Sequence, residues 1–519
     1  MTENHKENNK ETGYLRRLLG GSMLSIVNLL VGIGISFIMA PIFIHTLGPR
    51  HNGIWVTASV FTGWYALLDF GLSHAVSRFF TKSFASGNEE DCNTYASTGL
   101  FLYVILGGMA FLFAAVIGLV TFFFADSFFT EEIQDINLLA AVIILVGFAF
   151  ALDFPLRSLY GVTTGAMRHD LAGITSVVFR ILGAGVTLTV FYFGGRLISL
   201  VTVNAVLVMI QIFVYYLLAR HAFPKLHLSR KNVRKTHAVA LFGYSFYGFI
   251  AQIGDLIIYR VDNLVVGAMM SLSAVTHYNI AMTMVDYYKG LLMYASAWMV
   301  TWLTFLDARK DRENTLQTMV FGYKFCSCFS GFIVFGLVMW GKPFLARWMG
   351  TDYLDAMPCL VILAAAATIQ AMQEPNIRYL YATSNHHYFA FTNVLEGVLN
   401  LGMSILLVRM NYGMVGVALG TLIAAFLSRG ILIPFFVCRL LRQSLLRYYA
   451  RFLGYLLRMA VSLILPGILT VFLVEPNYPR LFLVGILSAV CYFPTIYYIG
   501  LNAGDRKKIL GFLFRKNPS

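Results

Sequence analysis

Charged residues are scarce in this sequence. Asp, Glu, Lys and Arg make up 12% of the 519 residues, about half of the ~25% found in soluble domains, whereas 58% of the residues are apolar. These charges are too few to cover the surfaces of the soluble domains that a chain of this length would form. A membrane-spanning helix needs roughly 20 mostly apolar residues, so the composition predicts an all-α integral membrane protein.

Acidic residues are fewer than basic ones, and several recognition motifs are missing. The chain has 25 Asp and Glu against 39 Lys and Arg, a net charge of +14. The basic residues lie in short clusters between apolar runs, which is typical of loops that orient a membrane protein. We find no Gly-rich phosphate loop, RNA-binding signature or zinc finger. We therefore expect no nucleic-acid partner, no ATPase motif and no other enzymatic activity.

Cysteine is rare as well, with six residues that lie mostly inside apolar runs. Cys326 and Cys328 are two residues apart on a predicted helix, so they point to different faces. We predict neither a disulfide framework nor a metal site.

Apolar windows along the chain predict about fourteen transmembrane helices. The loops between the windows are short, so no separate soluble domain is expected. The predicted spans are 22–44, 54–73, 98–124, 136–156, 174–193, 198–218, 241–266, 276–304, 319–340, 357–381, 388–408, 414–437, 455–474 and 481–501.

The distribution of Lys and Arg predicts the orientation. With fourteen spans, both termini lie on one side of the membrane, and the segments on that side contain 27 Lys and Arg against 6 on the other. The positive-inside rule then predicts a multi-pass protein of the cytoplasmic (inner) membrane with both termini in the cytoplasm.

A long basic loop after the sixth span suggests two halves. Gly53-Ile54-Trp55 opens the second span, and Thr276-His277-Tyr278 opens the eighth in a similar context. Duplicated halves with a substrate site between them recur among transporters. We predict a tail at 1–21, an N-lobe at 22–218, a basic linker at 219–240, a C-lobe at 241–437, a basic loop at 438–454, two C-terminal helices at 455–501 and a basic tail at 502–519.

One stretch of the N-lobe resembles a known family. The motifs are LGPRHNGIW at 47–55, LLDFGL at 67–72 and AVSRF at 75–79. They resemble the polysaccharide transporter family, the Wzx-type flippases of lipid-linked oligosaccharides. That family belongs to the multidrug/oligosaccharidyl-lipid/polysaccharide (MOP) superfamily, together with MATE exporters and the lipid II flippase MurJ.

The resemblance implies a fold and a cargo. Two pseudo-symmetric six-helix bundles would surround a central cavity, with two further helices after them. The cargo would be an oligosaccharide on a polyprenyl diphosphate, moved between leaflets by alternating access. An H⁺ or Na⁺ gradient or the membrane potential would drive it, without a cofactor. Partners would include membrane lipid and the polymerase or glycosyltransferases of the pathway. The product stays open among capsule, O-antigen of lipopolysaccharide, exopolysaccharide and teichuronic acid.

The same resemblance argues against lipid II itself as the cargo. The lipid II flippases have arginines within their first two helices. In this sequence Arg50 and Arg78 lie at the ends of the first two spans, whose interiors have no basic residue.

Basic residues inside the predicted spans are candidates for substrate binding, because each costs roughly 2.5–3.5 kcal/mol at mid-membrane on insertion scales. Arg260, near Asn263 in the seventh span, is the first candidate for the diphosphate, with a structural ion pair as the alternative. Arg180 has no acidic residue within a turn, whereas Lys289 follows Asp286 by three residues. The predicted cavity residues are Arg260, Arg180, Lys289, Arg429 and Asn263.

Acidic residues inside the spans are candidates for ion coupling or gating. Glu396 shares a polar helix face with Asn393 and has no basic residue within a turn, so it is the first candidate. Hydrogen bonding between helices is the alternative for this face. Asp69 lies in the LLDFGL motif at a helix end. The predicted coupling or gating residues are Glu396, Asp255, Asp69 and Glu374.

Two acid–arginine pairs lie beside prolines. Asp153 and Arg157 are four residues apart around Pro155, which predicts an ion pair within one helix. Glu374 and Arg378 repeat this spacing beside another proline, where a kink in the tenth span would act as a hinge.

Two other functions fit parts of the sequence. A MATE-like, cation-coupled exporter of organic cations needs an acidic aromatic cavity, and the intramembrane charges here are mixed. A membrane-embedded glycosyltransferase or polymerase of the same pathway generally needs a sizeable loop outside the membrane, and the longest loops here are short. The LLDFGL motif favours the flippase.

Overall fold

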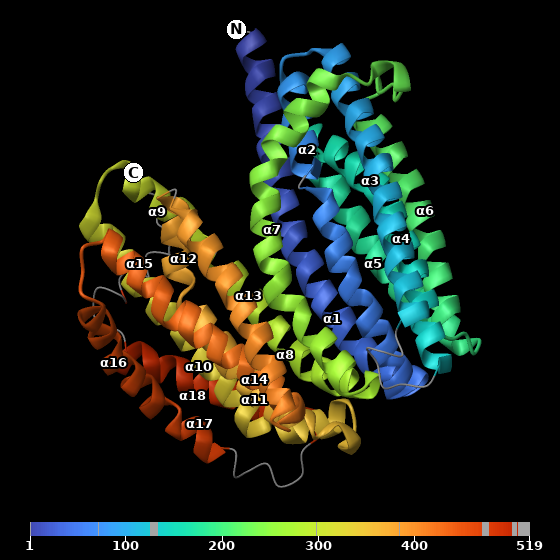
Figure 1. The fold of residues 1–519 in the computed structure, drawn as a ribbon. Helices are drawn as coiled ribbons and strands as arrows, with labels where there is room; N and C mark the ends of the chain where they lie inside the picture. The colour runs from blue at the N-terminus through green and yellow to red at the C-terminus, as the bar shows by residue number, and fades with distance from the viewer. Residues whose placement is uncertain are drawn as a thin grey trace. The chain divides into compact units, whose positions relative to one another are not determined.

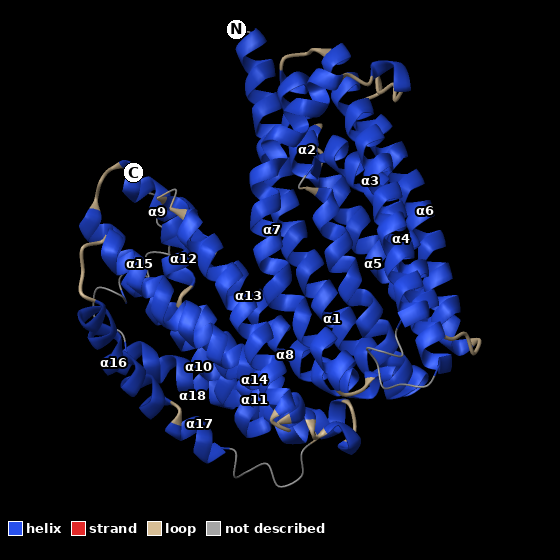
Figure 2. Cartoon of the chain, viewed as in Figure 1, coloured by secondary structure: helices blue, strands red, loops and turns tan. Residues whose placement is uncertain are grey.

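The computed structural model describes the backbone of residues 2–70, 72–124, 133–296, 298–383, 385–469, 477–500 and 506. The side chains at 2–26, at 244–260 and at some single positions lie outside this description. Every regular element in the described part is a helix, as Figure 2 shows.

The first of two compact units spans Met1–Thr276. Its helices are α1 (Thr2–Ala66), η1 (Leu67–Asp69), α2 (Leu72–Ala85), α3 (Glu89–Phe124), α4 (Ile133–Gly165), α5 (His169–Tyr192), α6 (Leu197–Ala222), η3 (Arg230–Asn232) and α7 (Lys235–Met269). Figure 1 shows α3 and α4 side by side, and these helices pack closely along their length. Tyr103, Phe154 and Val76 are fully buried in the core of this unit.

The second unit spans His277–Ser519. It contains most of α8 (Leu272–Ser296), then α9 (Trp298–Ala308), α10 (Arg312–Trp348), η4 (Thr351–Tyr353), α11 (Ala356–Met372), α12 (Glu374–Ala382), α13 (His386–Arg409), α14 (Gly413–Ala425), the π-helix η5 (Phe426–Leu432), α15 (Ile433–Leu440), α16 (Leu445–Ser462), α17 (Ile464–Leu469), α18 (Tyr478–Thr495) and η7 (Ile496–Gly500).

In the described part of the chain, every predicted span is mainly helical. Eleven helices there are long and apolar enough to cross a membrane. One of them, Leu30–Asp69, includes most of the first two predicted spans, 22–44 and 54–73, with a break at Gly48, whose φ is 78°. The predicted seventh span, 241–266, lies within α7, whereas the predicted eighth span, 276–304, includes most of α8 and the first part of α9. The spans were predictable because apolar length alone defines them.

The units divide at a different place from the predicted lobes. The seventh span is predicted to belong to the C-lobe, but α7 packs on α1, α2 and α3 in the first unit. The first turn of α8 is also held there, because the Thr276 hydroxyl donates to the Pro49 carbonyl oxygen over 2.6 Å and accepts from the Asn52 amide over 3.1 Å. Gly53 permits this packing, since a Cβ at that position would lie 1.7 Å from the Leu272 carbonyl oxygen.

The predicted basic linker is an ordered segment packed on α3. We call residues 220–235 the strap. Phe223 and Leu226 of the strap are buried in the core of the first unit. The strap backbone bonds to α3: the His227 N–H donates to Asn93 Oδ1 over 2.7 Å, and the Arg234 N–H donates to Thr98 Oγ1 over 3.2 Å.

Candidate functional site

The LLDFGL motif forms a helix break with a buried carboxylate. Helix α1 ends at Ala66, η1 follows, and Phe70 has a φ of 50° before α2 begins at Leu72. A positive φ is uncommon for a bulky residue, so the chain turns sharply there. The break places Asp69 in the interior of the first unit, where only 7% of the residue is exposed. Interrupted membrane helices commonly form ligand or ion sites.

Asp69 belongs to a charged cluster that three helical elements form. Its carboxylate accepts a hydrogen bond from the Tyr103 hydroxyl over 2.5 Å and lies 3.7 Å from Nη1 of Arg157. Arg157 Nε also donates to Asp153 Oδ2 over 2.9 Å. We call Asp69, Tyr103, Asp153 and Arg157 the first cluster. With all its charged groups ionised, two carboxylates share one guanidinium and the cluster has a net charge of −1.

The guanidinium of Arg157 is also enclosed by aromatic rings. It lies over the rings of Phe150 and Phe154, at 5.2 and 5.6 Å from their centroids. Cation–π contacts of this kind favour the charged arginine. The predicted Asp153–Arg157 pair is thus present, but Arg157 also reaches Asp69 on another element, which the sequence analysis did not anticipate.

The second unit contains a matching cluster at another pair of helix breaks. Helix α11 ends at Met372, and α12 begins at Glu374. Arg378 Nη2 lies 2.7 Å from Glu374 Oε2. The Ser296 hydroxyl at the end of α8 donates to the same Oε2 over 3.4 Å and accepts from Arg378 over 3.5 Å. We call Ser296, Glu374 and Arg378 the second cluster; its one carboxylate and one guanidinium sum to zero.

A third group of polar side chains is buried where α13 packs on η5. The Glu396 and Arg429 side chains are only 3% and 4% exposed, and Arg429 Nε donates to Glu396 Oε2 over 2.6 Å. The other oxygen of Glu396 accepts from the Gln370 amide over 2.7 Å, and Ser428 donates to Oε2 over 2.6 Å. Arg429 also donates to Asn393 Oδ1.

This third group changes how two predicted site residues are interpreted. Glu396 has no basic residue within a turn of its own helix, as predicted, but Arg429 neutralises it from another helix. Arg429 lies in the middle of a π-helix, a helical form that is frequent at functional sites. Both side chains satisfy each other in this conformation, so neither is accessible to a substrate.

The five remaining predicted residues lie on helices α5, α7 and α8, and three of them have described side chains. Arg180 is exposed at the centre of α5, Lys289 lies 3.8 Å from Asp286 as the sequence indicated, and Asn263 is buried in α7. The side chains of Arg260 and Asp255 lie outside the described residues.

Arg180 has a distinctive environment. Its guanidinium lies against Gly32 of α1, where an added Cβ would come within 1.7 Å of Nη1. It forms no ion pair with any residue of the described part of the chain. An exposed arginine at the centre of a 24-residue apolar helix is strongly unfavourable in lipid, so it needs a polar surrounding.

Sequence reasoning missed Tyr103 and Ser296 as members of charged clusters. A signal was available, because Glu374 and Arg378 follow Asp153 and Arg157 by the same 221 residues (374 − 153 and 378 − 157). Ser296 follows Asp69 by a similar 227 residues (296 − 69). Aligning the two halves of the sequence at this offset would have matched the polar residues of the first cluster to those of the second.

Known proteins resemble this chain in sequence and fold. Residues 46–301 match the family described as Polysaccharide biosynthesis protein. The uncharacterized membrane protein EpsK of Bacillus subtilis is 20% identical over 491 residues, which cover 93% of this chain and 95% of the relative.

Two solved transporters share the fold. The lipid II flippase MurJ, in an inward closed conformation, matches with a TM-score of 0.68 at 14% identity, over 92% of this chain and 98% of that chain. An inward-facing MATE family transporter of the MOP superfamily matches with a TM-score of 0.62 at 13% identity, over 83% and 99%. The predicted all-helical, multi-pass MurJ/MATE-like fold is confirmed.

Proposed function

We propose that this chain is a flippase for a polyprenyl-diphosphate-linked oligosaccharide, because residues 46–301 match the family described as Polysaccharide biosynthesis protein. The MOP superfamily fold supports transport rather than catalysis. The cargo would cross the cytoplasmic membrane by alternating access, with both termini of the protein in the cytoplasm.

Arg180 is the observation that supports this proposal best. A diphosphate needs cationic partners inside the membrane, and Arg180 is the described candidate that is both exposed and without an ion-pair partner among the described residues. Lys289 has Asp286 beside it, and Arg429 has Glu396. We therefore infer that Arg180 contacts the diphosphate. Arg260 remains a candidate from the sequence alone.

We further propose that the first cluster couples transport to an H⁺ or Na⁺ gradient. Its net charge of −1 needs a compensating cation in a medium of low dielectric constant. The second cluster and the Glu396–Arg429 pair are each balanced. This assignment favours Asp69 over Glu396 and Glu374 as the coupling carboxylate.

The substrate class is tested by ligand-induced thermal stabilisation of the purified full chain. At about 100 times its dissociation constant, a ligand stabilises the folded state by roughly 2.7 kcal/mol. We expect stabilisation by undecaprenyl-diphosphate oligosaccharide and none by a cationic dye at equal concentration. Stabilisation by the dye alone would contradict the flippase and favour a MATE-like exporter.

The role of Arg180 is tested with a displacement variant. Gly32→Ala adds a methyl group where the guanidinium lies, so it moves a flexible side chain and leaves the charge in place. We expect Arg180→Ala to abolish translocation in proteoliposomes and Gly32→Ala to reduce it at least tenfold, both with near-normal thermal stability. Gly34→Ala is the matched control, because nothing lies within 4 Å of its added Cβ. Full activity in Arg180→Ala would remove this residue from the site.

A further inference from the structure

The strap has an apolar inner side and a cationic outer side. Its sixteen residues include six Lys and Arg and no acidic residue. Phe223 and Leu226 are buried against the unit, whereas all six cationic residues are exposed. They are Arg220, Lys225, Arg230, Lys231, Arg234 and Lys235.

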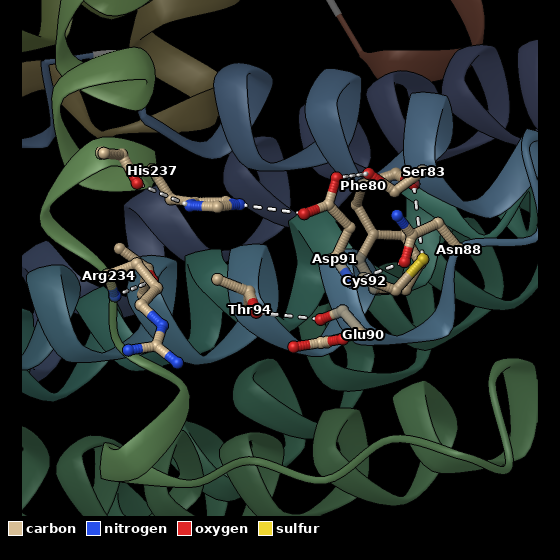
Figure 3. A network of polar contacts seen from close by, with 11 residues as sticks. Phe80, Ser83, Asn88, Glu90, Asp91, Cys92, Thr94, Arg234 and His237 are labelled. Carbon is tan, nitrogen blue, oxygen red and sulfur yellow. Dashed lines mark hydrogen bonds and ion pairs between the residues drawn. The ribbon is translucent and has the colours of Figure 1, made fainter.

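The backbone of the strap is held in place by side chains of α3. Besides the bonds to Asn93 and Thr98, the Ser229 N–H donates to Ser97 Oγ over 3.2 Å. Just after the strap, His237 bonds to Asp91 Oδ1 at 3.1 Å, as Figure 3 shows. The cationic side chains therefore project from a fixed support, and less ordering entropy opposes binding.

Most of the strap's cations are not neutralised within the unit. Lys225 pairs with Glu89, and Arg230 lies over the Phe101 ring at 5.5 Å. The others, which are Arg220, Lys231, Arg234 and Lys235, have no ion pair with any residue in the described ranges.

The exposed apolar surfaces of α3 and α6 locate the strap relative to the bilayer. On α3 the exposed apolar residues run from Val104 to Phe124, and on α6 from Ile198 to Leu217. At 1.5 Å per residue each stretch is about 30 Å long, the thickness of the hydrocarbon core. Arg230 contacts Phe101, and Arg220 follows Leu217 by three residues, so the strap lies at the level of the headgroups.

We propose that the strap binds the phosphate groups of anionic phospholipids in the leaflet it borders. Clusters of Lys and Arg beside a membrane helix attract anionic lipids, each residue contributing enough for about a fivefold preference. The cations extend from the end of α6 to the start of α7, which suits several separate headgroups better than one diphosphate. This site is independent of the proposed substrate and of its binding at Arg180.

Native mass spectrometry of the full chain, extracted from bilayers with equal phosphatidylglycerol and phosphatidylcholine, tests this proposal. We expect the wild-type protein to retain phosphatidylglycerol preferentially and to lose this preference at high salt. The combined variant Arg220→Gln, Lys231→Gln, Arg234→Gln should lower the preference by about fivefold per residue. A charge-conserving control, Arg220→Lys, Lys231→Arg, Arg234→Lys, should keep it.

Three outcomes would overturn the proposal. They are equal retention of both lipids by the wild-type protein, an unchanged preference in the glutamine variant, and displacement of phosphatidylglycerol by equimolar undecaprenyl diphosphate. The last outcome would assign the strap to the substrate. Thermal stability of each variant in neutral lipid shows whether it is folded.

Discussion

The first and second clusters are two versions of one arrangement. In each unit an acidic residue and an arginine lie four positions apart beside a proline, and the arginine reaches a polar residue at a break in another helix. The residue at the break is Asp69 in the first unit and Ser296 in the second. The shared geometry supports an internal duplication, and the difference at the break sets the charge.

Because of this difference at the break, the second cluster has a net charge of zero and the first has a net charge of −1. Glu374 and Arg378 balance each other, and Ser296 adds only a hydroxyl. In the first unit Asp153 and Asp69 compete for Arg157, and Tyr103 supplies a further hydrogen bond. The second cluster therefore resembles a structural pair, whereas the first has an excess charge that the proposed coupling cation would balance. Three experiments test whether the two clusters differ in this way.

Removing the arginine of either cluster should have the largest effect on the free energy of unfolding, and the loss should be larger in the first cluster. Breaking a buried ion pair costs about 3–5 kcal/mol, and the partial exposure of these side chains lowers that, so we expect about 3 kcal/mol for Arg157→Ala. Arg378→Ala leaves one carboxylate instead of two, so we expect about 1–2 kcal/mol. Chemical unfolding in detergent measures both, with Arg157→Lys and Arg378→Lys as controls. Equal losses would show that Asp69 adds nothing to the first cluster.

Neutralising the break residue should change coupling more than stability. Asp69→Asn removes the excess charge while keeping a group that can accept from Tyr103. We expect translocation to lose most of its dependence on an imposed H⁺ or Na⁺ gradient, because no cation is then needed for balance. Glu374→Gln in the second cluster should keep that dependence. An unchanged response in Asp69→Asn, with loss in Glu396→Gln, would move the coupling to the Glu396–Arg429 pair.

The reach of sequence analysis differs among these sites for a physical reason. Apolar length and the spacing of four residues are local, so the spans and the Asp153–Arg157 pair were predictable. Glu396 and Arg429 are separated by 33 positions (429 − 396), and Asp69 and Arg157 by 88 (157 − 69). Only tertiary packing brings such residues together. Local spacing reveals only partners on the same helix. It therefore does not show that Arg429 pairs with Glu396, or that Arg157 contacts Asp69 in addition to Asp153.

Tyr103 offers the smallest and most specific change within the first cluster. Its fully buried hydroxyl donates to Asp69, and Tyr103→Phe removes this bond without altering any charge. A hydrogen bond to a charged group contributes about 1.5–3 kcal/mol, so we expect a loss at the lower end of that range, because Arg157 still faces the carboxylate.

The control for this variant is Tyr160→Phe on α4, because Tyr160 is 40% exposed and its hydroxyl has no hydrogen bond to a described residue. Unfolding free energies should therefore fall for Tyr103→Phe and stay unchanged for Tyr160→Phe. The gradient dependence of Tyr103→Phe should also persist, since both carboxylates and the arginine remain. If it disappears instead, the hydroxyl of Tyr103 takes part in cation binding itself, and the excess charge alone does not explain coupling.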